Sequence, residues 1–434
     1  MNLTRSIQYN SKLTTFEKAT AEIKSGDNLF ISGNASSPND LLQYIAKRKD
    51  ELKNVSVYHL LLLGKNPLAV EGMENHIRIS SFFVGASERA MIQAGRGDYT
   101  PIFLSEIPKL FLDKIIPINI AYLMVSPPDD HGYMSLGVEC VASKSALEVA
   151  EKVIVQVNEN MPRTHGNTFI NVSEVYKIIE HTAPLQEIDC PAPTDEEKRI
   201  ASFISPLIND ESTLQLGIGG IPNAVLASLE GKKNLGIHTE MISDGLLDAI
   251  EKGIVTNMKK NFRHKKAVAT FALGSRQLYE FLNDNPIFEF FPCDWTNNPF
   301  TIAKNDNMIS INSALQIDVT GQVCAESLGT NIYSGFGGQL DFVRGANASK
   351  GGKSIIALQS TAKNGTISRI VPQHLIGSGV LTTRGDVRFV VTEYGVINLF
   401  GKNLRQRAEA LINIAHPKFR DDLINEVKQV YKFF

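Results

Sequence analysis

The sequence contains few cysteines and no long apolar run, and both absences restrict what the protein can be. Four cysteines in 434 residues, with no CxxC pair, do not make a disulfide framework and favour a reduced compartment. The apolar stretch from Leu60 to Leu63 is typical of the longest ones, which have the length of a strand and cannot span a bilayer. The first residues lack the apolar core of a signal peptide. We therefore expect a cytoplasmic protein without a membrane partner.

Several functional classes lack their sequence signatures. There is no HExxH motif, no cluster of His and Cys, and no GxSxG turn, so no metal site is expected and a zinc or serine hydrolase is disfavoured. The formal net charge is only −2, and the densest basic run, residues 263–266, is short. A nucleic-acid partner is therefore not expected.

An internal repeat is the most informative feature that is present. GNASSPNDLLQYI begins at Gly33, and GIGGIPNAVLASL begins at Gly217, with Pro-Asn at the same offset in both. Each copy continues into an apolar strand on which a histidine, His59 or His238, occupies a matching point. SFFVGAS from Ser81 then resembles a later TFALGSR, and one further match, from Ile118 and Ile311, follows in the same order. We interpret this pattern as a duplicated pair of domains.

Short apolar strands alternate with helical patterns in each copy, which predicts an α/β fold with two related domains and largely parallel sheets. A proline-rich, acidic stretch at residues 181–201 predicts the boundary, and Thr194 before acidic residues predicts a helix start. The expected domains are therefore residues 1–190 and residues 191–434.

Glu240 is the clearest difference between the two copies. The matching position of the first copy is Leu61, within an apolar run. A carboxylate is costly at a half-buried site that its twin fills with leucine, so Glu240 is a candidate for chemistry. The alternative is a carboxylate that emerges at the strand end and only caps a helix or pairs with a cation.

Glycine-rich turns form a second candidate feature. SGFGGQLDFVRGA from Ser334 replaces a helical stretch of the first copy, and its glycines let backbone N–H groups approach an oxyanion or a phosphate. The turn at Gly217 opens a helix whose free N–H groups favour negative charge. It is not a dinucleotide fingerprint, because Pro222 stands where a third glycine is needed. Such turns are also common without any ligand.

Eight stretches of the sequence resemble the acetyl-CoA hydrolase/transferase family, which includes 4-hydroxybutyrate CoA-transferases and butyryl-CoA:acetate CoA-transferases. They cover both halves of the chain, and the likeness is closest to the 4-hydroxybutyrate and butyrate members. The stretches are VSPPDDHGYMSLG from Val125, NENMPRTHG from Asn158, GIGGIPNAVL from Gly217, LGIHTEMISDG from Leu235, FALGSRQLYEFLNDNP from Phe271, NDNMISINSALQIDVTGQV from Asn305, SGFGGQLDFVRGA from Ser334, and VTEYGVINLFGKNLRQRAEALINIAHPKFRDDL from Val391.

The resemblance implies a class I CoA-transferase fold and a glutamate nucleophile in the HTEM stretch, which is Glu240 here. Glu393 in the TEYG stretch is the second candidate carboxylate, and it fits a structural role equally well. The resemblance also implies oxyanion or CoA-binding residues in the two glycine turns. These residues are Gly219, Gly220, Gly337, Gly338 and Gln339.

The implied reaction transfers CoA from acetyl-CoA, or another short acyl-CoA, to a short carboxylate such as 4-hydroxybutyrate through a glutamyl-CoA thioester. CoA is then a cosubstrate, no permanently bound cofactor is needed, and a homodimer is the family expectation. Arg344, Lys402 and Arg405 are candidates for the CoA phosphates, although exposed basic residues are more often only solvated. The alternatives are a butyryl-CoA:acetate CoA-transferase, an acetyl-CoA hydrolase, and a non-catalytic acyl-CoA sensor.

Overall fold

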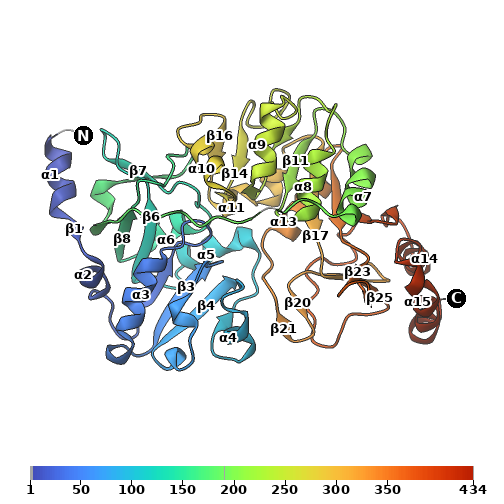
Figure 1. The fold of residues 1–434 in the computed structure, drawn as a ribbon, viewed down its shortest axis with the longest axis horizontal. Coiled ribbons are helices and arrows are strands. Elements are labelled where there is room, and N and C mark those ends of the chain that lie inside the picture. Colours follow the sequence, from blue (N-terminus) through green and yellow to red (C-terminus); the bar gives the residue numbers. More distant parts are fainter. Residues whose placement is uncertain (1–2, 190, 434) are drawn as a thin grey trace. The chain divides into compact units, whose positions relative to one another are not determined.

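The computed structural model describes residues 3–189 and 191–433, which fall into two compact units (Figure 1). The first unit spans Met1–Asp189 and Val268–Thr296, and the second spans Cys190–Ala267 and Asn297–Phe434. Each unit is built around one mostly parallel sheet with helices beside it, so the predicted α/β class is confirmed.

The sheet of the first unit has eight strands, all joined in parallel. Its central strand β6 reads IAYLMV and is buried at every position, as expected for a strand covered on both faces. In spatial order the strands are β1 (Leu13–Thr14), β10 (Lys177–Glu180), β8 (Lys152–Val157), β6 (Ile120–Val125), β2 (Asn28–Ile31), β3 (Val55–Leu60), β4 (Ile77–Phe83) and β5 (Asp98–Tyr99).

Helices cover this sheet with their apolar sides. On α3, for example, Leu41, Leu42 and Ile45 share one face at helical spacing and join the core formed by β2 and β3. The α-helices of the first unit are α1 (Leu3–Ser11), α2 (Phe16–Thr20), α3 (Asn39–Lys47), α4 (Arg89–Gln93), α5 (Ile107–Leu112), α6 (Ser143–Val149), α10 (Arg276–Leu282) and α11 (Cys293–Thr296).

The sheet of the second unit repeats the strand order of the first. The order β26-β22-β17-β11-β12 corresponds to β10-β8-β6-β2-β3, and the repeated motifs predict three of these pairs, β6 with β17, β2 with β11 and β3 with β12. One added strand, β27, pairs antiparallel with β26. In spatial order the strands are β12 (Gly236–Ile237), β11 (Thr213–Leu216), β17 (Met308–Ser313), β22 (Lys353–Ala357), β26 (Phe389–Thr392) and β27 (Gly395–Asn398).

The segment Val268–Thr296 belongs to the first unit, although the predicted domain 191–434 contained it. Backbone hydrogen bonds account for its placement: Cys140 N donates to Thr270 O at 3.0 Å, and Ala272 N donates to Val138 O at 2.8 Å. The segment therefore adds strands β15 (Phe271–Ala272) and β16 (Phe288–Phe290) to a unit that already has the sheet of the first copy.

Helices of the second unit follow its strands in the same alternating manner. Within the described part of the chain, no helix in either unit has the length and apolar character that a membrane crossing needs. The α-helices of the second unit are α7 (Asp195–Ile204), α8 (Gly220–Ala227), α9 (Asp244–Glu251), α12 (Pro299–Ile302), α13 (Gln339–Ala348), α14 (Leu404–Asn413) and α15 (Pro417–Tyr431).

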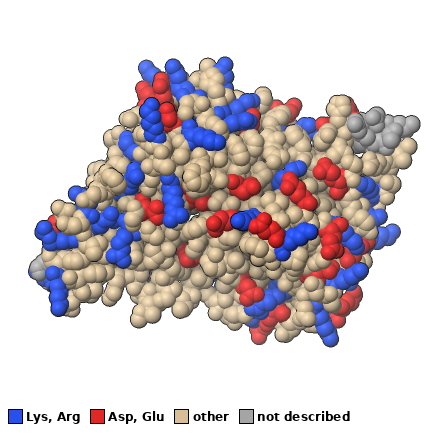
Figure 2. Space-filling view, turned by 180° about the vertical axis from the view of Figure 1, so that it is seen from behind, with Lys and Arg blue, Asp and Glu red and all other residues tan. Residues whose placement is uncertain are grey.

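Charged side chains of both signs mix on the surface. On the face shown in Figure 2, Lys and Arg form small groups among Asp and Glu rather than one continuous basic surface. A face of this kind lacks the single-signed field that would draw in a polyanion.

Helix α7 begins at the predicted N-cap, Thr194. Its Oγ1 accepts from Glu197 N at 3.3 Å, and the Glu197 carboxylate accepts from Thr194 N at 2.8 Å. Thr194→Ala is therefore expected to lower the free energy of unfolding of the second unit by about 1 kcal/mol. A urea titration with Thr194→Ser as the control measures this, and equal midpoints for the alanine variant and the parent would contradict the capping role.

Candidate active site

Glu240 lies at the carboxyl end of the second sheet, just beyond edge strand β12. Hydrogen bonds to β11 hold the chain in line after the strand ends. His238 N donates to Leu214 O at 3.1 Å, and Thr239 Oγ1 donates to Leu216 O at 3.1 Å. Glu240 is thus fixed at the edge where parallel α/β sheets usually bind their ligands.

Two donors from other segments of the same unit hold the Glu240 carboxylate. Asn297 Nδ2 donates to Glu240 Oε2 at 2.9 Å, and the backbone N–H of Gly338 donates to the same carboxylate. A Cβ atom at Gly338 would overlap both Glu240 Oε2 and Asn297 Nδ2, so a glycine is required for this approach.

Burial controls the ionisation of Glu240. Desolvation raises the pKa of this carboxyl to about 7, against the lowering effect of the hydrogen bonds from Asn297 and Gly338. The residue as a whole is nevertheless only partly buried. The result is a carboxylate near its own pKa at neutral pH that a ligand can still reach, which suits a nucleophile.

Asn297 is a site residue that the sequence reasoning missed. It precedes helix α12 in an Asn-Asn-Pro run, which is typical of a helix start, and Asn298 does cap that helix. The Asn297 side chain is fully buried, and its Oδ1 has no hydrogen-bond partner among the described residues. No sequence signal distinguishes Asn297 from its neighbour, because only the tertiary structure brings it to Glu240.

His238 packs the nucleophile strand against the helix that carries Gly338 at its start. Its fully buried ring lies edge-on to Phe342 of α13, with centroids 6.2 Å apart. Asn305 Nδ2 lies 3.2 Å from His238 Nδ1. The matching His59 of the first unit instead lies 3.1 Å from the Glu88 carboxylate, also fully buried. Both histidines are core residues that fix the strand ends.

The structure brings Gly338 to Glu240, whereas the side chain of Gln339 is used elsewhere. Gln339 Nε2 donates to Ser313 O at 2.7 Å, and its Oε1 accepts from Thr382 Oγ1 at 3.0 Å. Gly337 has a left-handed φ of 53°, which turns the chain into α13. The Gln339 side chain thus ties the start of α13 to its neighbours, and its assignment as an oxyanion or CoA-binding residue stays a prediction.

The Gly217 turn reaches the same edge, because it follows β11 and β11 pairs with β12. Gly219, with a φ of 110°, precedes α8. A Cβ at Gly220 would overlap the carboxylate of Glu197. A resident carboxylate thus lies beside the start of α8, and the assignment of Gly219 and Gly220 as oxyanion donors stays a prediction.

The remaining predicted residues have protein partners or lie exposed. Arg344 Nε is 3.3 Å from Asp386 Oδ1, and Arg405 Nη1 is 3.0 Å from Glu409 Oε1. Lys402 is exposed. Their roles as phosphate contacts stay predictions.

Glu393, the second candidate carboxylate, has a structural environment. It accepts from Ser360 N at 2.9 Å and from Ser360 Oγ at 2.5 Å, and it is 7% exposed. The carboxylate therefore anchors the turn after β22, as the structural alternative for Glu393 expects.

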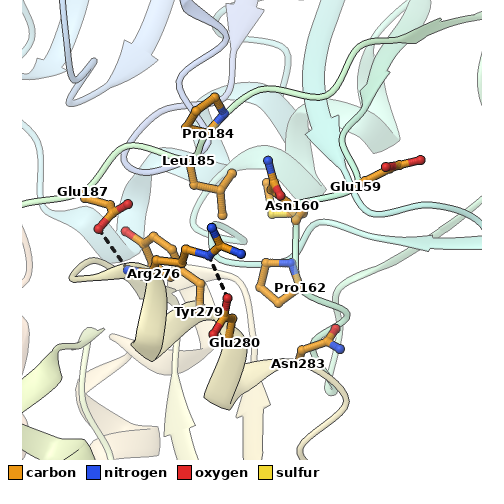
Figure 3. Close-up of a pocket in the computed structure, with 11 residues that line it drawn as sticks. Glu159, Asn160, Pro162, Pro184, Leu185, Glu187, Arg276, Tyr279, Glu280 and Asn283 are labelled. Atoms are coloured by element: carbon orange, nitrogen blue, oxygen red, sulfur yellow. Dashed lines mark hydrogen bonds and ion pairs between the residues drawn. The ribbon is translucent and has the colours of Figure 1, made fainter.

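A cavity of about 550 Å³ lies in the first unit, between two of the family-like stretches (Figure 3). Arg276 and Glu280 pair at its edge, with Arg276 Nε 2.7 Å from Glu280 Oε1, and Tyr279 OH donates to Gln186 O at 2.7 Å. None of the predicted site residues lines it. Elsewhere, no group of three or more His, Cys, Asp or Glu among the described residues is placed to hold a metal ion.

Family models for the acetyl-CoA hydrolase/transferase N-terminal and C-terminal domains match residues 2–187 and 274–427. A 4-hydroxybutyrate coenzyme A transferase of Clostridium kluyveri is 49% identical, covering 97% of this chain and 98% of the relative. A butyryl-CoA:acetate CoA-transferase of Anaerostipes caccae is 40% identical, covering 97% of each. The crystal structure of a 4-hydroxybutyrate CoA-transferase from Porphyromonas gingivalis has a TM-score of 0.85 at 40% identity, covering 98% of this chain and 100% of that one.

Proposed function

Because this chain belongs to the acetyl-CoA hydrolase/transferase family, we propose that Glu240 is the nucleophile of its CoA transfer. The chain is a CoA-transferase by its relationship to the enzymes named above, with CoA as cosubstrate. One observation supports the assignment of the residue more than any other. The carboxylate of Glu240, a residue that is only partly buried, is held by Asn297 and by the Gly338 N–H at the carboxyl end of the sheet.

The reaction begins on the acyl-CoA thioester. A Glu240 carboxylate oxygen attacks the carbonyl carbon, the C–S bond breaks, and CoA thiolate leaves behind a mixed anhydride. The thiolate then attacks the glutamyl carbonyl, forming a glutamyl-CoA thioester and releasing the first carboxylate. A second carboxylate repeats the two steps in reverse and leaves as its CoA ester. The exchange is covalent and follows ping-pong kinetics.

Asn297 and Gly338 act on the glutamyl carbonyl in this scheme. Each time that carbon becomes tetrahedral, negative charge develops on the oxygen that the two donors already hold. A preorganised donor of this kind typically contributes about 10²–10³ in rate. The two hydrogen bonds from Asn297 and Gly338, which lower the pKa of Glu240, therefore also stabilise the tetrahedral intermediates that form at its carbonyl carbon.

The pKa of Glu240 predicts the pH dependence. Attack requires the carboxylate, so kcat/KM for acyl-CoA is expected to rise about tenfold per pH unit below pH 7 and to level off above it. Initial rates with a saturating acid acceptor between pH 5 and 9 measure the profile. A profile that levels off near pH 4.5 instead of pH 7 would mean that Glu240 titrates like an exposed carboxyl and is not desolvated.

For the substrates, we propose acetyl-CoA as donor and 4-hydroxybutyrate as acceptor, with butyrate as the alternative acid. The named relatives support a short carboxylate and differ in which one they use. Hydrolysis of acetyl-CoA is the side reaction of the same scheme, and it grows if water reaches the anhydride.

The experiment is trapping of the intermediate. The protein is mixed with butyryl-CoA without acceptor, reduced with borohydride, and digested for mass spectrometry. A reduced residue at Glu240, absent in Glu240→Gln, is expected. Modification at Glu393 would move the nucleophile. An unmodified protein that releases CoA rapidly would indicate a hydrolase, and one that releases none would indicate an acyl-CoA sensor.

Three further properties are proposed. The protein works as a homodimer, which sedimentation equilibrium tests, and it holds no cofactor permanently, because thiolate is a good leaving group and the steps need no other group. We place it in the cytoplasm. Three of the four cysteines, Cys140, Cys293 and Cys324, are buried thiols, as suits a reduced compartment.

A further inference from the structure

A buried amide pair joins two strands next to the nucleophile. Gln215 on β11 and Asn312 on β17 exchange hydrogen bonds, with Asn312 Nδ2 to Gln215 Oε1 at 3.1 Å and Gln215 Nε2 to Asn312 Oδ1 at 3.3 Å. Gln215 is 4% exposed, and Asn312 is half-buried. Each amide keeps one further N–H and one further lone pair, so the pair can still donate to and accept from a third polar group.

The pair lies on the same face of the sheet as Glu240. Met308 packs against Phe342 of α13, and Asn312 follows Met308 at an even spacing along β17, so both side chains face that helix. The His238 ring also contacts Phe342, and Glu240 lies two residues further on. Gln215 shares this face because its amide meets that of Asn312.

Gly217, which has no side chain, lies between Glu240 and the Gln215–Asn312 pair. Leu214 pairs with Ile237 and Leu216 with Ile311. Gly217 follows Leu216 and Asn312 follows Ile311, so Gly217 lies beside Asn312 where β11 ends. On its other side the chain runs from β12 through Thr239, whose Oγ1 bonds to Leu216, to Glu240. Neighbouring strands lie about 4.8 Å apart, so β12 and β17 are about 10 Å apart across β11. A Cβ atom at Gly217 would meet no other atom within 4 Å, so the space above this glycine is open.

We infer that the acyl chain of the acid substrate runs from Glu240 over Gly217, and that the Gln215–Asn312 pair binds a hydroxyl group on its far end. The enzyme thus selects short hydroxy acids over alkyl acids of the same length. An unsubstituted chain would cover the spare amide groups without bonding them, which costs binding energy, whereas a hydroxyl both accepts and donates there. The inference rests on the proposed function, because it takes Glu240 as the reacting group.

The experiment compares 4-hydroxybutyrate with butyrate, which differ only in the hydroxyl group. The readout is the ratio of their kcat/KM values as acceptors of CoA from acetyl-CoA. The parent enzyme is expected to prefer 4-hydroxybutyrate by about tenfold or more. In the double variant Gln215→Leu/Asn312→Leu the ratio is expected to fall about 10–100-fold. Both partners are replaced together, so that neither amide is left buried and unpaired.

Two further variants keep the test decisive. Gln277→Leu makes the same chemical change at an exposed position on α10 and should leave the ratio unchanged. Gly217→Ala adds one methyl group to the open space at a backbone φ that is not left-handed. It should lower kcat/KM for both four-carbon acids about tenfold relative to acetate, and it carries the test if the double variant does not fold.

The outcomes separate this inference from the proposed function. A parent enzyme that prefers butyrate, or an amide-pair variant with the parent's ratio, would overturn the inference while borohydride still traps the intermediate at Glu240. An unchanged acid preference in Gly217→Ala would overturn it as well. Absence of the trapped intermediate in the parent enzyme would instead overturn the proposed function.

Discussion

Glu240→Gln is expected to lower kcat/KM for CoA transfer by about 10⁴-fold or more, the scale of removing a covalent nucleophile. A glutamine amide has nearly the same shape and can keep a hydrogen bond at the Asn297 position, so the loss reflects nucleophilicity rather than packing. An acyl-exchange assay with labelled acetate measures it. Deamidation would restore activity slowly, so fresh protein is required.

The same variant has an opposite effect on stability. The pKa of Glu240 in the folded protein, about 7, lies above the 4.5 of an ordinary glutamate, so folding favours the protonated carboxyl. This favourable contribution is fully present below pH 4.5 and is lost as the pH rises through 7. Above pH 7 the neutral glutamine avoids the cost of the buried charge, so Glu240→Gln should be about 1–3 kcal/mol more stable than the parent. Urea titrations at pH 8 measure the difference.

Glu393→Gln is the matched control, since Glu393 binds Ser360 at a site without a catalytic assignment in the structure. Its transfer rate per folded molecule should stay within a few-fold of the parent. A reversed pattern, with an active Glu240→Gln and an inactive Glu393→Gln, would contradict the assigned nucleophile.

Asn297→Ala is expected to lower kcat by about 10²–10³, because it removes one of the two donors to the glutamyl oxygen. It should also move the rising limb of the pH profile to higher pH, since the hydrogen bond from Asn297 lowers the pKa of Glu240. A purely structural role for Asn297 would lower the amount of folded protein and leave the limb in place. Rates and pH profiles of the purified variant distinguish the two.

Asn298→Ala provides the control for that experiment. The Asn298 Oδ1 accepts from Phe300 N at 2.9 Å and caps α12. The substitution removes this cap and should lower the free energy of unfolding by about 1 kcal/mol, without removing a contact of Glu240. An unchanged limb in Asn297→Ala, or an equal shift in Asn298→Ala, would remove Asn297 from the reaction.

The duplicated motifs predicted the sheets well for a physical reason. A glycine turn, a Pro-Asn helix start and a following apolar strand at constant spacing define one α/β unit, and right-handed connections leave few ways to arrange such units. Five strands therefore follow the same order in both sheets. The placement of Val268–Thr296 escaped prediction, because its apolar pattern suits either unit and only backbone hydrogen bonds to residues such as Val138 decide between them.

Prediction of the site was less complete. Glu240 stood out because an apolar residue fills its twin position, and Gly338 because glycine runs interrupt an otherwise helical pattern. Asn297 has neither kind of contrast, and its role depends on a contact across 57 positions of sequence. The assignment of Gln339 came from the family resemblance and stays a prediction, and its amide bonds to Ser313 and Thr382.

The segment Val268–Thr296, which joins the first unit from the second half of the sequence, also determines the order in which the chain can fold during synthesis. The first unit contains Val268–Thr296, so it is incomplete when the ribosome has passed residue 189. At 5–20 residues per second, about 5–20 s more are needed before residue 296 is made. During this interval the Val138 carbonyl and the Cys140 N–H lack the backbone partners that residues 270–272 later supply. Chaperones can bind the nascent chain in this state.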